Sequence, residues 1–367
     1  MADPRVERLA HLLVHYSAPI EKGDLVEING TTASAPLLRE IYRETLRAGG
    51  RPLLRMTLPD QEEIYYKNAD DDALTTISPV DALVIETFAC RFSVLGQENT
   101  RSLAAVDQAR QSMAQQARGP LLETFMRRDQ EGMLKWSICQ FPAAGNAQDA
   151  GMSLSDYEDF VYGACLLDHA DPVAAWQEVR ARHQTLVDYL AGKREVHVIG
   201  PDTDLRFSIA GRTFINDYGT KNLPGGEVFS SPVEDSTEGT VRFSFPASYG
   251  GQIVDDVRLT FRAGRVVEAR ASSNEGFLHR MLDLDDGARI LGECAFGTND
   301  NITAYTRNVL FDEKIGGTMH LALGAGYPES GALNHSALHW DMVTDLRNGS
   351  TIHVDGDLFS RNGIFTR

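Results

Sequence analysis

The pattern of the chain changes near Lys193, and this change limits the folds that the sequence can adopt. After Lys193, short runs of alternating polar and apolar residues follow one another, separated by Gly, Asp and Pro turns; they include EVHVIG, LRFSIA, VRFSFPA, VRLTFRAG and VVEARA. Alternation with a period of two is typical of half-buried strands. Before Lys193, helical patterns dominate from Gly119 to Leu190. We therefore expect a β-rich α+β domain whose strands come late in the chain.

The N-terminal segment alternates between the apolar spacing of a helix and that of a strand. Apolar residues spaced for one helical face predict a helix over 5–16, and a short strand is expected at 24–28. A second helix is predicted over 35–48, where Gly49-Gly50 ends it before a strand at 52–58. The apolar run ALVIETFA, at 82–89, predicts a further buried strand.

Such a βαβ unit favours parallel strands joined by a right-handed crossover. The predicted fold class is thus α/β plus α+β. A small N-terminal α/β domain over residues 1–110 precedes a larger β-rich α+β domain over residues 111–367, which carries the polar residues described below.

Charge and composition exclude several classes of partner. The 367 residues carry a formal net charge of −17, and no Lys/Arg block interleaved with aromatic residues occurs, so neither nucleic acid nor a membrane is an expected partner. No apolar run reaches the roughly 18 residues of a membrane span, and the first residues lack the pattern of a signal peptide, which favours the cytoplasm. The widely spaced cysteines predict reduced, buried thiols rather than disulfides or a thiolate zinc site.

Two glutamates stand next to glycine turns. In NLPGGEVFSSP, a tight turn places Glu227 at the start of a strand, although a solvated surface glutamate would look the same. In LGECAFGTND, Glu293 lies among small and apolar residues, so its carboxylate is expected to point inward. An inward carboxylate needs a cation or a network of donors. The alternative is an ion pair with Arg289 or Arg307.

The densest segment is FDEKIGGTMHLALGAGYPESG. It places Glu313 before a glycine turn, His320 at the head of an apolar strand and Tyr327 after a second glycine turn. An acid, an imidazole and a phenol are thereby expected close together. His320 on its own also fits a histidine of the core.

His339 and Asp341 are two residues apart in SALHWDMVTDLR. On a strand, both side chains point to one face and Trp340 points to the other. On a helix they would diverge by about 200°. A second pair with this spacing, His353 and Asp355 in TIHVDGDL, is interpreted as part of a hairpin with an Asp-Gly turn.

Together these segments supply three glutamates, two histidines and one aspartate, without a cysteine. Oxygen and imidazole donors suit Zn²⁺, Co²⁺ or Mn²⁺, and six donors with carboxylates able to bridge suit two ions. Two ions about 3.5–4 Å apart can activate a shared hydroxide while polarising a carbonyl. The sequence therefore predicts a metal-dependent hydrolase.

The segments NLPGGEVF, GECAFGTN, FDEKIGGTMHLALG, GYPESG and HWDM resemble, in this order, the successive motifs of the M29 family of metallo-aminopeptidases. The resemblance covers nearly the whole chain, including AGMSLSDYEDFVYGA in the helical part. It implies two divalent ions (Zn, Co or Mn), peptides with a free N-terminus as substrates, and a homodimer. It also implies a catalytic tyrosine at Tyr327, a bridging and catalytic carboxylate at Glu293, and metal ligands at Glu227, Glu293, Glu313, His320, His339 and Asp341.

Under this hypothesis, a hydroxide bridging the two ions attacks the first peptide carbonyl, one ion holds the α-amine, and the Tyr327 hydroxyl donates to the oxyanion. Two alternatives stay open: a dinuclear hydrolase of another amide or ester, and a metal-dependent peptide-binding protein without turnover. The chain departs from the family in its spacing around GYPESGALNHSALHWD and in the FDEKIGGTMH link. Substrate preference is therefore not carried over, and Glu313 is the ligand that depends most on this spacing.

Overall fold

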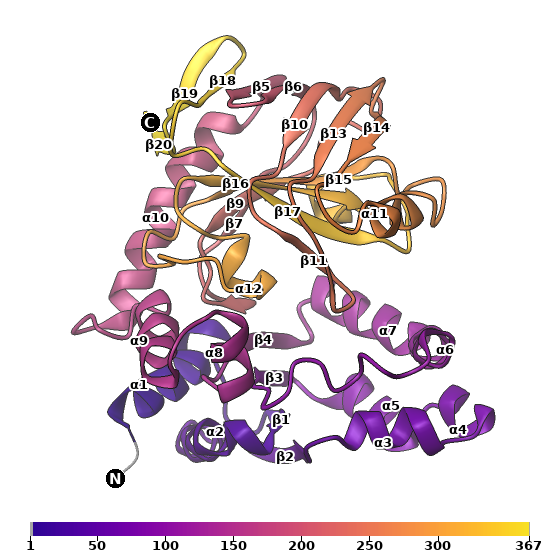
Figure 1. Ribbon diagram of the computed structural model, residues 1–367. Helices are drawn as coiled ribbons and strands as arrows, with labels where there is room; N and C mark the ends of the chain where they lie inside the picture. Colours follow the sequence, from indigo (N-terminus) through magenta and orange to yellow (C-terminus); the bar gives the residue numbers. More distant parts are fainter. Residues whose placement is uncertain (1–2, 367) are drawn as a thin grey trace. The chain divides into compact units, whose positions relative to one another are not determined.

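The computed structural model describes residues 3–366, and Figure 1 shows its ribbon coloured along the chain. The chain divides into two compact units. Unit 1 consists of Met1–Val173 and Gly219–Leu223, and unit 2 consists of Ala174–Tyr218 and Pro224–Arg367. A parallel sheet with helices in unit 1 and large antiparallel sheets in unit 2 confirm the predicted fold class.

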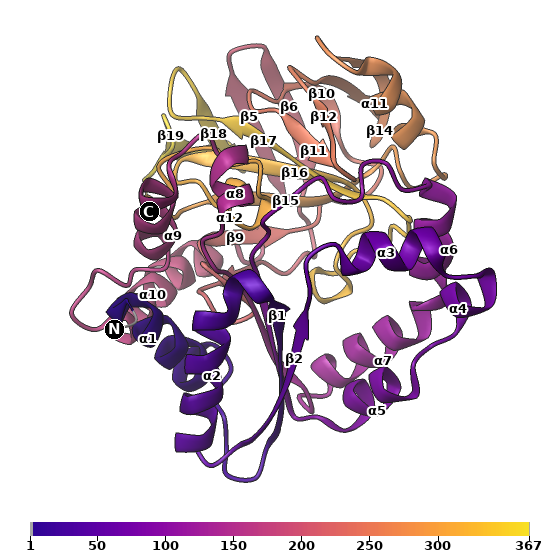
Figure 2. The ribbon, with the colours of Figure 1, turned by 60° about the horizontal axis from the view of Figure 1, so that its bottom comes forward.

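A five-stranded parallel sheet forms the centre of unit 1. Its strand β1 buries Val26 and Ile28 completely, and it lies beside β2 (Figure 2). In sheet order, the strands are β2 (Arg51–Thr57), β1 (Leu25–Thr31), β3 (Cys90–Leu95), β4 (Lys135–Gln140) and β8 (Asn222–Leu223).

Helix α2 (Ala35–Arg47) connects β1 to β2, as predicted. Its buried face includes Leu37, Leu38 and Ile41, and the chain turns away where Gly49 adopts a φ of 87°, a conformation that favours glycine. The other helical segments of this part are α1 (Pro4–Leu12), the π-helical η1 (Leu13–Ser17), the 3-10 turn η2 (Thr32–Ser34), α3 (Gln61–Asn68), α4 (Asp71–Thr75), α5 (Pro79–Thr87), α6 (Gln108–Ala117), α7 (Gly119–Gln130), α8 (Ala144–Asp149) and α9 (Leu154–Ala164).

The strand predicted at 82–89 is wrong, because this segment belongs to helix α5. The Ser78 side chain accepts a hydrogen bond from the Val80 backbone N, and Pro79 occupies the first turn. A serine cap followed by proline is a helix start, and a short apolar run cannot by itself distinguish a buried helix from a buried strand. The next strand of the sheet is β3, which begins at Cys90.

The domain boundary expected at residue 110 falls inside unit 1. Strand β4 lies after this position and pairs with β3 along its whole length, so the first sheet needs residues up to 140. Strand β8, at Asn222 and Leu223, adds a last parallel pairing with β4. The helical segment from Gly119 to Leu190, assigned to the second domain from sequence, is thus divided between the two units.

Unit 2 contains two larger antiparallel sheets and a hairpin. The eight-stranded sheet has, in order, β14 (Arg265–Arg270), β13 (Arg258–Arg262), β10 (Glu238–Arg242), β6 (Thr203–Ser208), β5 (Glu195–Gly200), β18 (Thr351–Val354), β19 (Asp357–Arg361) and β20 (Ile364–Phe365). The five-stranded sheet has β17 (His339–Asp345), β16 (Thr318–Gly324), β15 (Leu291–Gly297), β9 (Glu227–Ser230) and β7 (Ile215–Asp217). The remaining elements are the hairpin β11 (Ala247–Tyr249) with β12 (Gln252–Val254), and α10 (Pro172–Leu190), α11 (Glu275–Leu282), α12 (Val309–Asp312) and the 3-10 turn η3 (Pro328–Ser330).

One large apolar core joins the strands of unit 2. Phe207 and Leu259 contribute to it from the eight-stranded sheet, and Phe296 and Trp340 contribute from the five-stranded sheet. Four of the alternating runs predicted as strands lie in β5, β6, β13 and β14, whereas VRFSFPA is a strand only at Val241 and Arg242, in β10, and at Ala247, in β11. No helix within residues 3–366 is both long enough and apolar enough to cross a bilayer.

The interpretation of VDGD as a hairpin turn is confirmed. Asp355 and Gly356 join β18 to β19 and have φ values of 50° and 85°. Two successive positive φ angles are typical of the tight two-residue hairpin turn. In the eight-stranded sheet, His353 of β18 is paired with His197 of β5, and the centres of their rings lie 6.4 Å apart.

Candidate metal centre

Three neighbouring strands align four of the predicted ligands on one face of the five-stranded sheet. Glu293 on β15 and Asp341 on β17 both pair with Ala322 of β16, from opposite sides. Directly paired residues share a face, and His320 lies two residues before Ala322, so its side chain shares that face too. His339 lies two residues before Asp341 and is opposite Gly324, which has no side chain to cover it.

Two further acids come from the ends of other elements. Glu227 opens β9, beside β15, and follows Gly226, whose φ is 130°. A side chain at Gly226 would collide with Asn299, so this tight entry requires glycine. Glu313 directly follows α12, which Asn308 caps through a hydrogen bond from the Leu310 backbone N.

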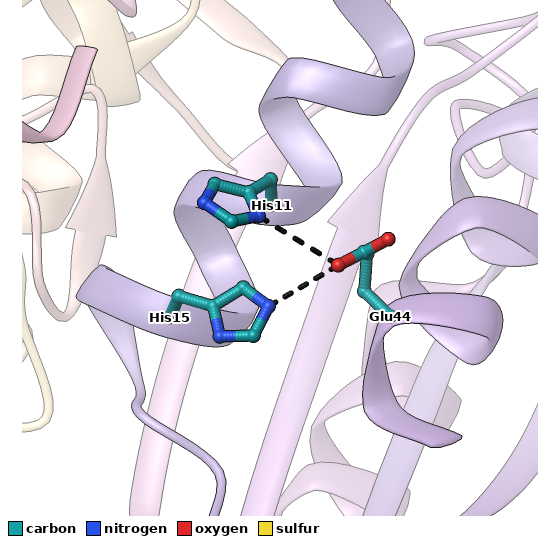
Figure 3. Close-up of side chains that lie close together, drawn as sticks. All are labelled: His11, His15 and Glu44. Atoms are coloured by element: carbon teal, nitrogen blue, oxygen red, sulfur yellow. Dashed lines mark hydrogen bonds and ion pairs between the residues drawn. The ribbon is translucent and has the colours of Figure 1, made fainter. Parts of the chain in front are cut away.

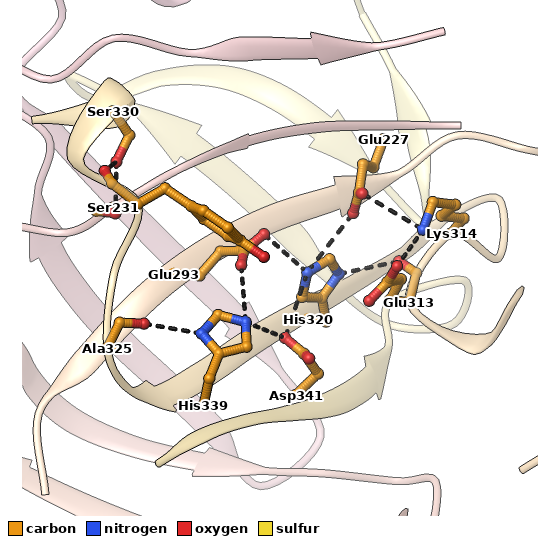
Figure 4. Close-up of polar contacts among 11 residues, drawn as sticks. Glu227, Ser231, Glu293, Glu313, Lys314, His320, Ala325, Ser330, His339 and Asp341 are labelled. Atoms are coloured by element: carbon orange, nitrogen blue, oxygen red, sulfur yellow. Dashed lines mark hydrogen bonds and ion pairs between the residues drawn. The ribbon is translucent and has the colours of Figure 1, made fainter. Parts of the chain in front are cut away.

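Both histidines turn their Nε2 atoms toward carboxylates (Figure 4). His320 Nε2 lies 3.2 Å from Glu293 Oε1, 3.6 Å from Glu227 Oε2 and 3.9 Å from Asp341 Oδ1. His339 Nε2 lies 3.4 Å from Glu293 Oε2 and 3.6 Å from Asp341 Oδ1. The structure therefore brings these five predicted ligands into one group, with Glu293 in contact with both imidazoles.

Backbone carbonyls orient the two imidazole rings. His320 Nδ1 lies 2.9 Å from the carbonyl oxygen of Glu313, and His339 Nδ1 lies 2.8 Å from that of Ala325. An N–H at Nδ1 that donates to a carbonyl leaves Nε2 as the atom available to a ligand. Both rings are thus held with their free nitrogens facing the carboxylates.

Burial and mutual charge shift the pKa of every member of this group. Burial raises the pKa of Glu227 well above its usual value and that of Asp341 to about 6. Burial would also raise the pKa of Glu293, but hydrogen bonds from both histidines outweigh it and lower the pKa to about 2. Burial lowers the pKa of His320 and His339, yet the surrounding carboxylates raise both to about 10. In the absence of an ion, the two imidazoles therefore carry positive charge that compensates the carboxylates.

Two carboxylate oxygens in this group have no hydrogen-bond donor. Among the described residues, Glu227 Oε2 and Asp341 Oδ1 are buried side-chain oxygens without a hydrogen-bond partner. Buried carboxylate oxygens are normally compensated by donors or cations. These oxygens, together with the two imidazole nitrogens, fit divalent cations.

Overlapping sets of donors could hold such cations. In each set, one atom per residue lies within 4.8 Å of the others. Glu293 is shared by the first two of the three sets, which are Glu227 with Glu293 and His320; Glu293 with His339 and Asp341; and Glu313 with His320 and Asp341. All six predicted ligands therefore belong to at least one set.

Tyr327 lies beside the same group. Its ring meets the His339 ring edge-on at 5.4 Å and the Phe229 ring at 5.5 Å. The turn after it is fixed, because the Ser330 hydroxyl donates to the Tyr327 carbonyl and shares a 2.6 Å hydrogen bond with Ser231 (Figure 4). Burial, followed by the charges of Glu293 and the other acids, raises the pKa of the Tyr327 phenol, which therefore stays protonated and able to donate.

Lys314 is a member of the cluster that the sequence analysis missed. Its side chain is completely buried, with Nζ 3.5 Å from Glu227 Oε1 and in contact with Glu313 Oε1. Lysine is among the residues that are least often buried, so the residue type gave no reason to expect Lys314 in the cluster. Its position directly after Glu313 was the one available signal.

The arginine alternative for Glu293 is not what the structure shows. Arg289 pairs with Asp283, at 2.6 Å, and not with Glu293. Within residues 3–366, the ion-pair partners of Glu293 are His320 and His339. The inward orientation expected for this carboxylate is found, and its side chain is 5% exposed.

Unit 1 contains another set of three donors, on its surface (Figure 3). His15 Nε2 and His11 Nδ1 lie 3.1 Å and 3.7 Å from Glu44 Oε2, while Arg47 binds Glu44 Oε1. The spacing of the two histidines, four residues apart in a predicted helix, could have indicated it. The side chains of His11 and His15 are 59% and 36% exposed, in contrast to the buried group of unit 2.

Comparison with known proteins agrees with this geometry. Residues 2–365 match the family described as thermophilic metalloprotease (M29). The chain belongs to the M29 family. The resemblance noted in the sequence motifs is thereby confirmed, and it extends over the whole chain.

Curated relatives of this M29 protein are named as aminopeptidases. Aminopeptidase 2 of Geobacillus stearothermophilus is 28% identical, over 96% of this chain and 91% of the relative. Aminopeptidase T of Thermus aquaticus is 30% identical, over 92% and 85%. These names agree with the metallo-aminopeptidase predicted from the sequence.

Solved structures show how far the fold is shared. Wild-type AmpT from Thermus thermophilus superposes with a TM-score of 0.86 at 26% identity, covering 99% of both chains. A 2,5-dihydroxypyridine dioxygenase from Pseudomonas putida KT2440 gives a TM-score of 0.61 at 12% identity, covering 98% of this chain and 96% of the other. The second likeness concerns the fold alone, so the chemistry has to be argued from the site.

Proposed function

We propose that this M29 protein is an aminopeptidase that uses two divalent ions to release N-terminal residues from peptides with a free α-amine. The arrangement of Glu293 carries the proposal. Its Oε1 faces His320 and its Oε2 faces His339, so one carboxylate lies between two separate donor sets. A carboxylate with this position can bridge two ions.

Two metal positions follow from the donor sets. Position A is formed by Glu293, His339 and Asp341, and position B is formed by Glu227, Glu293 and His320. Glu313 adjoins position B, because its Oε1 shares the Lys314 ammonium with Glu227. We propose Zn²⁺, Co²⁺ or Mn²⁺ as the occupants, since carboxylate and imidazole donors suit these ions.

When bound, the two ions would supply a water molecule that is deprotonated near neutral pH and would polarise the scissile carbonyl. The protein's own residues define the rest of the reaction. The carbonyl contacts to His320 and His339 hold the imidazoles in the tautomer that binds through Nε2. The free α-amine of a peptide would be held in its neutral form by one of the ions.

Tyr327 is proposed as the donor to the oxyanion. Its phenol keeps its proton because burial and the neighbouring carboxylates disfavour the phenolate. A fixed donor acts mainly where negative charge develops in the transition state. The edge-on contact with His339 and the Ser330 hydrogen bond hold this residue in place.

The experiment that tests this function uses matched substrates. Purified protein is stripped with a chelator, reloaded with each ion and assayed on aminoacyl reporters with free and acetylated amines. Cleavage of the free reporter alone, restored by at least one of the three ions, is expected. Equal cleavage of the acetylated reporter would favour a hydrolase of other amides or esters. Ion binding without any cleavage would favour a peptide-binding protein.

Two further properties are proposed with this function. The family resemblance favours a homodimer, which sedimentation of the purified protein would measure. All four cysteines are free and buried, which suits a reducing compartment, and we propose the cytoplasm.

A further inference from the structure

Lys314 has no part in the proposed reaction, although it lies inside the cluster (Figure 4). Its ammonium contacts Glu227 and Glu313, and its side chain is completely buried. A buried charge is stable only where opposite charges compensate it. The Lys314 ammonium thus supplies a positive charge at the end of the cluster that contains Glu227 and Glu313.

At the other end of the cluster, no described lysine or arginine forms an ion pair with Asp341 or Glu293. Within residues 3–366, Asp341 forms ion pairs with His320 and His339 alone, as Glu293 does. Asp341 Oδ1 is in addition buried without a hydrogen-bond donor. The two metal positions therefore differ in the positive charge that the protein places beside them.

Backbone hydrogen bonds fix Lys314 where it is. Its N–H donates to the Phe311 carbonyl at 2.9 Å, and its own carbonyl accepts from the Asn299 N–H at 3.0 Å. The residue is thereby held from both sides of the α12 turn. An ion at position B would therefore lie next to an ammonium group whose backbone is fixed by these hydrogen bonds.

We propose that Lys314 makes the two metal positions unequal, so that position A fills first and retains its ion while position B exchanges its ion readily. This inference rests on the proposed function. At position B, a divalent ion has to replace the Lys314 ammonium as the partner of Glu227. The ion must then remain next to that ammonium. Repulsion between neighbouring cations is stronger in a buried site than in water.

The test is a metal titration of the full-length protein in a His15→Ala background, which removes the exposed donors of unit 1 from the count. Chelator-stripped protein is titrated with Co²⁺, followed by visible absorbance, and ions retained after gel filtration are counted by elemental analysis. The background protein is expected to retain one ion and to bind a second with affinity at least about tenfold weaker.

Lys314→Met, added to this background, is expected to strengthen the second binding step by at least about tenfold and to retain two ions. Lys193→Met is the matched control, because Lys193 lies outside the cluster, near Asp355, and should leave both steps unchanged. If Lys314→Met does not fold, Lys314→Gln takes its place, and the two-step loading of the background protein still tests the inequality.

The outcomes separate the inference from the function on which it rests. Two equal binding steps in the background protein, or a second step that weakens in the Lys314 variants, would overturn the inference and leave the dinuclear aminopeptidase standing. Failure of every variant to bind any ion would overturn the proposed function, and this inference with it.

Discussion

His320 and Glu293 face each other across neighbouring strands, with Nε2 3.2 Å from Oε1. The contact exists because β15 and β16 pair in antiparallel fashion and both residues point to the same face. Since Glu293 also meets His339 through its second oxygen, it is shared by the two proposed metal positions.

Glu293→Gln is therefore expected to abolish the binding of both ions and to lower kcat/KM by more than about 100-fold. Titration with Co²⁺, followed by visible absorbance, measures the first effect, and a free-amine reporter measures the second. Glu268→Gln, at an exposed position on β14, serves as the control and should change neither. Binding of two ions by Glu293→Gln, with the affinities of the parent protein, would contradict the bridging role.

Tyr327→Phe is expected to bind both ions as the parent protein does and to lower kcat by roughly 100- to 1000-fold with little change in KM, because the donor acts on charge that develops in the transition state. Steady-state kinetics and metal analysis on the same sample separate the two effects. Tyr305→Phe is the matched control: this half-buried phenol donates to the Pro246 carbonyl and not to a proposed ligand, so activity should persist. Full turnover of Tyr327→Phe would exclude the role.

Metal affinity is expected to rise with pH. In the ion-free cluster, the pKa values of His320 and His339 are about 10, so both rings are protonated at neutral pH. A metal binds the neutral imidazole, and each occupied position must release a proton. Calorimetry in buffers with different ionisation enthalpies should show about one to two protons released per chain at pH 7. Heats that do not depend on the buffer would argue against histidine ligation.

His183 is expected to contribute less to the stability of the folded protein in mild acid. This buried imidazole lies 2.6 Å from Thr298 Oγ1 and 3.1 Å from Asn216 Oδ1, and burial lowers its pKa to about 4. Between pH 6.5 and 4 the unfolded chain binds the proton and the folded protein does not, so the contribution present above pH 6.5 is progressively lost, by about 2 kcal/mol at pH 5.

Urea unfolding between pH 5 and 7 measures this dependence. His183→Gln should be less stable at pH 7, yet its stability should change less with pH. His279→Gln, at a largely exposed position, is the control and should keep the slope of the parent protein. An unchanged slope in His183→Gln would assign the acid sensitivity to other groups.

Local chemistry made part of this fold predictable. The Asp355-Gly356 turn and the same-face placement of His339 and Asp341 depend on residues that are adjacent in sequence, and the structure contains both arrangements. The error at α5 has a local cause as well, because Ser78 and Pro79 form a helix start that the apolar run concealed.

The contacts across strands could not be predicted in this way. Every residue of β15 and β16 is buried. Neither strand therefore has the polar and apolar alternation that would show on which face of the sheet Glu293 or His320 lies. A register shift between Leu291 and Glu293 also sets the facing of this carboxylate, and it depends on pairing with a distant strand. The burial of Lys314 likewise depends on two acids, one of which is far away in the sequence.

The short strand β8 has a consequence for the order in which the protein folds during synthesis. Asn222 and Leu223 complete the sheet of unit 1 beside Ile138 and Cys139, but the chain has by then already produced residues 174–218 of unit 2. Folding of the N-terminal unit on the ribosome therefore cannot finish before residue 223 has emerged. For the same reason, no single cut of the chain releases either unit with all of its strands.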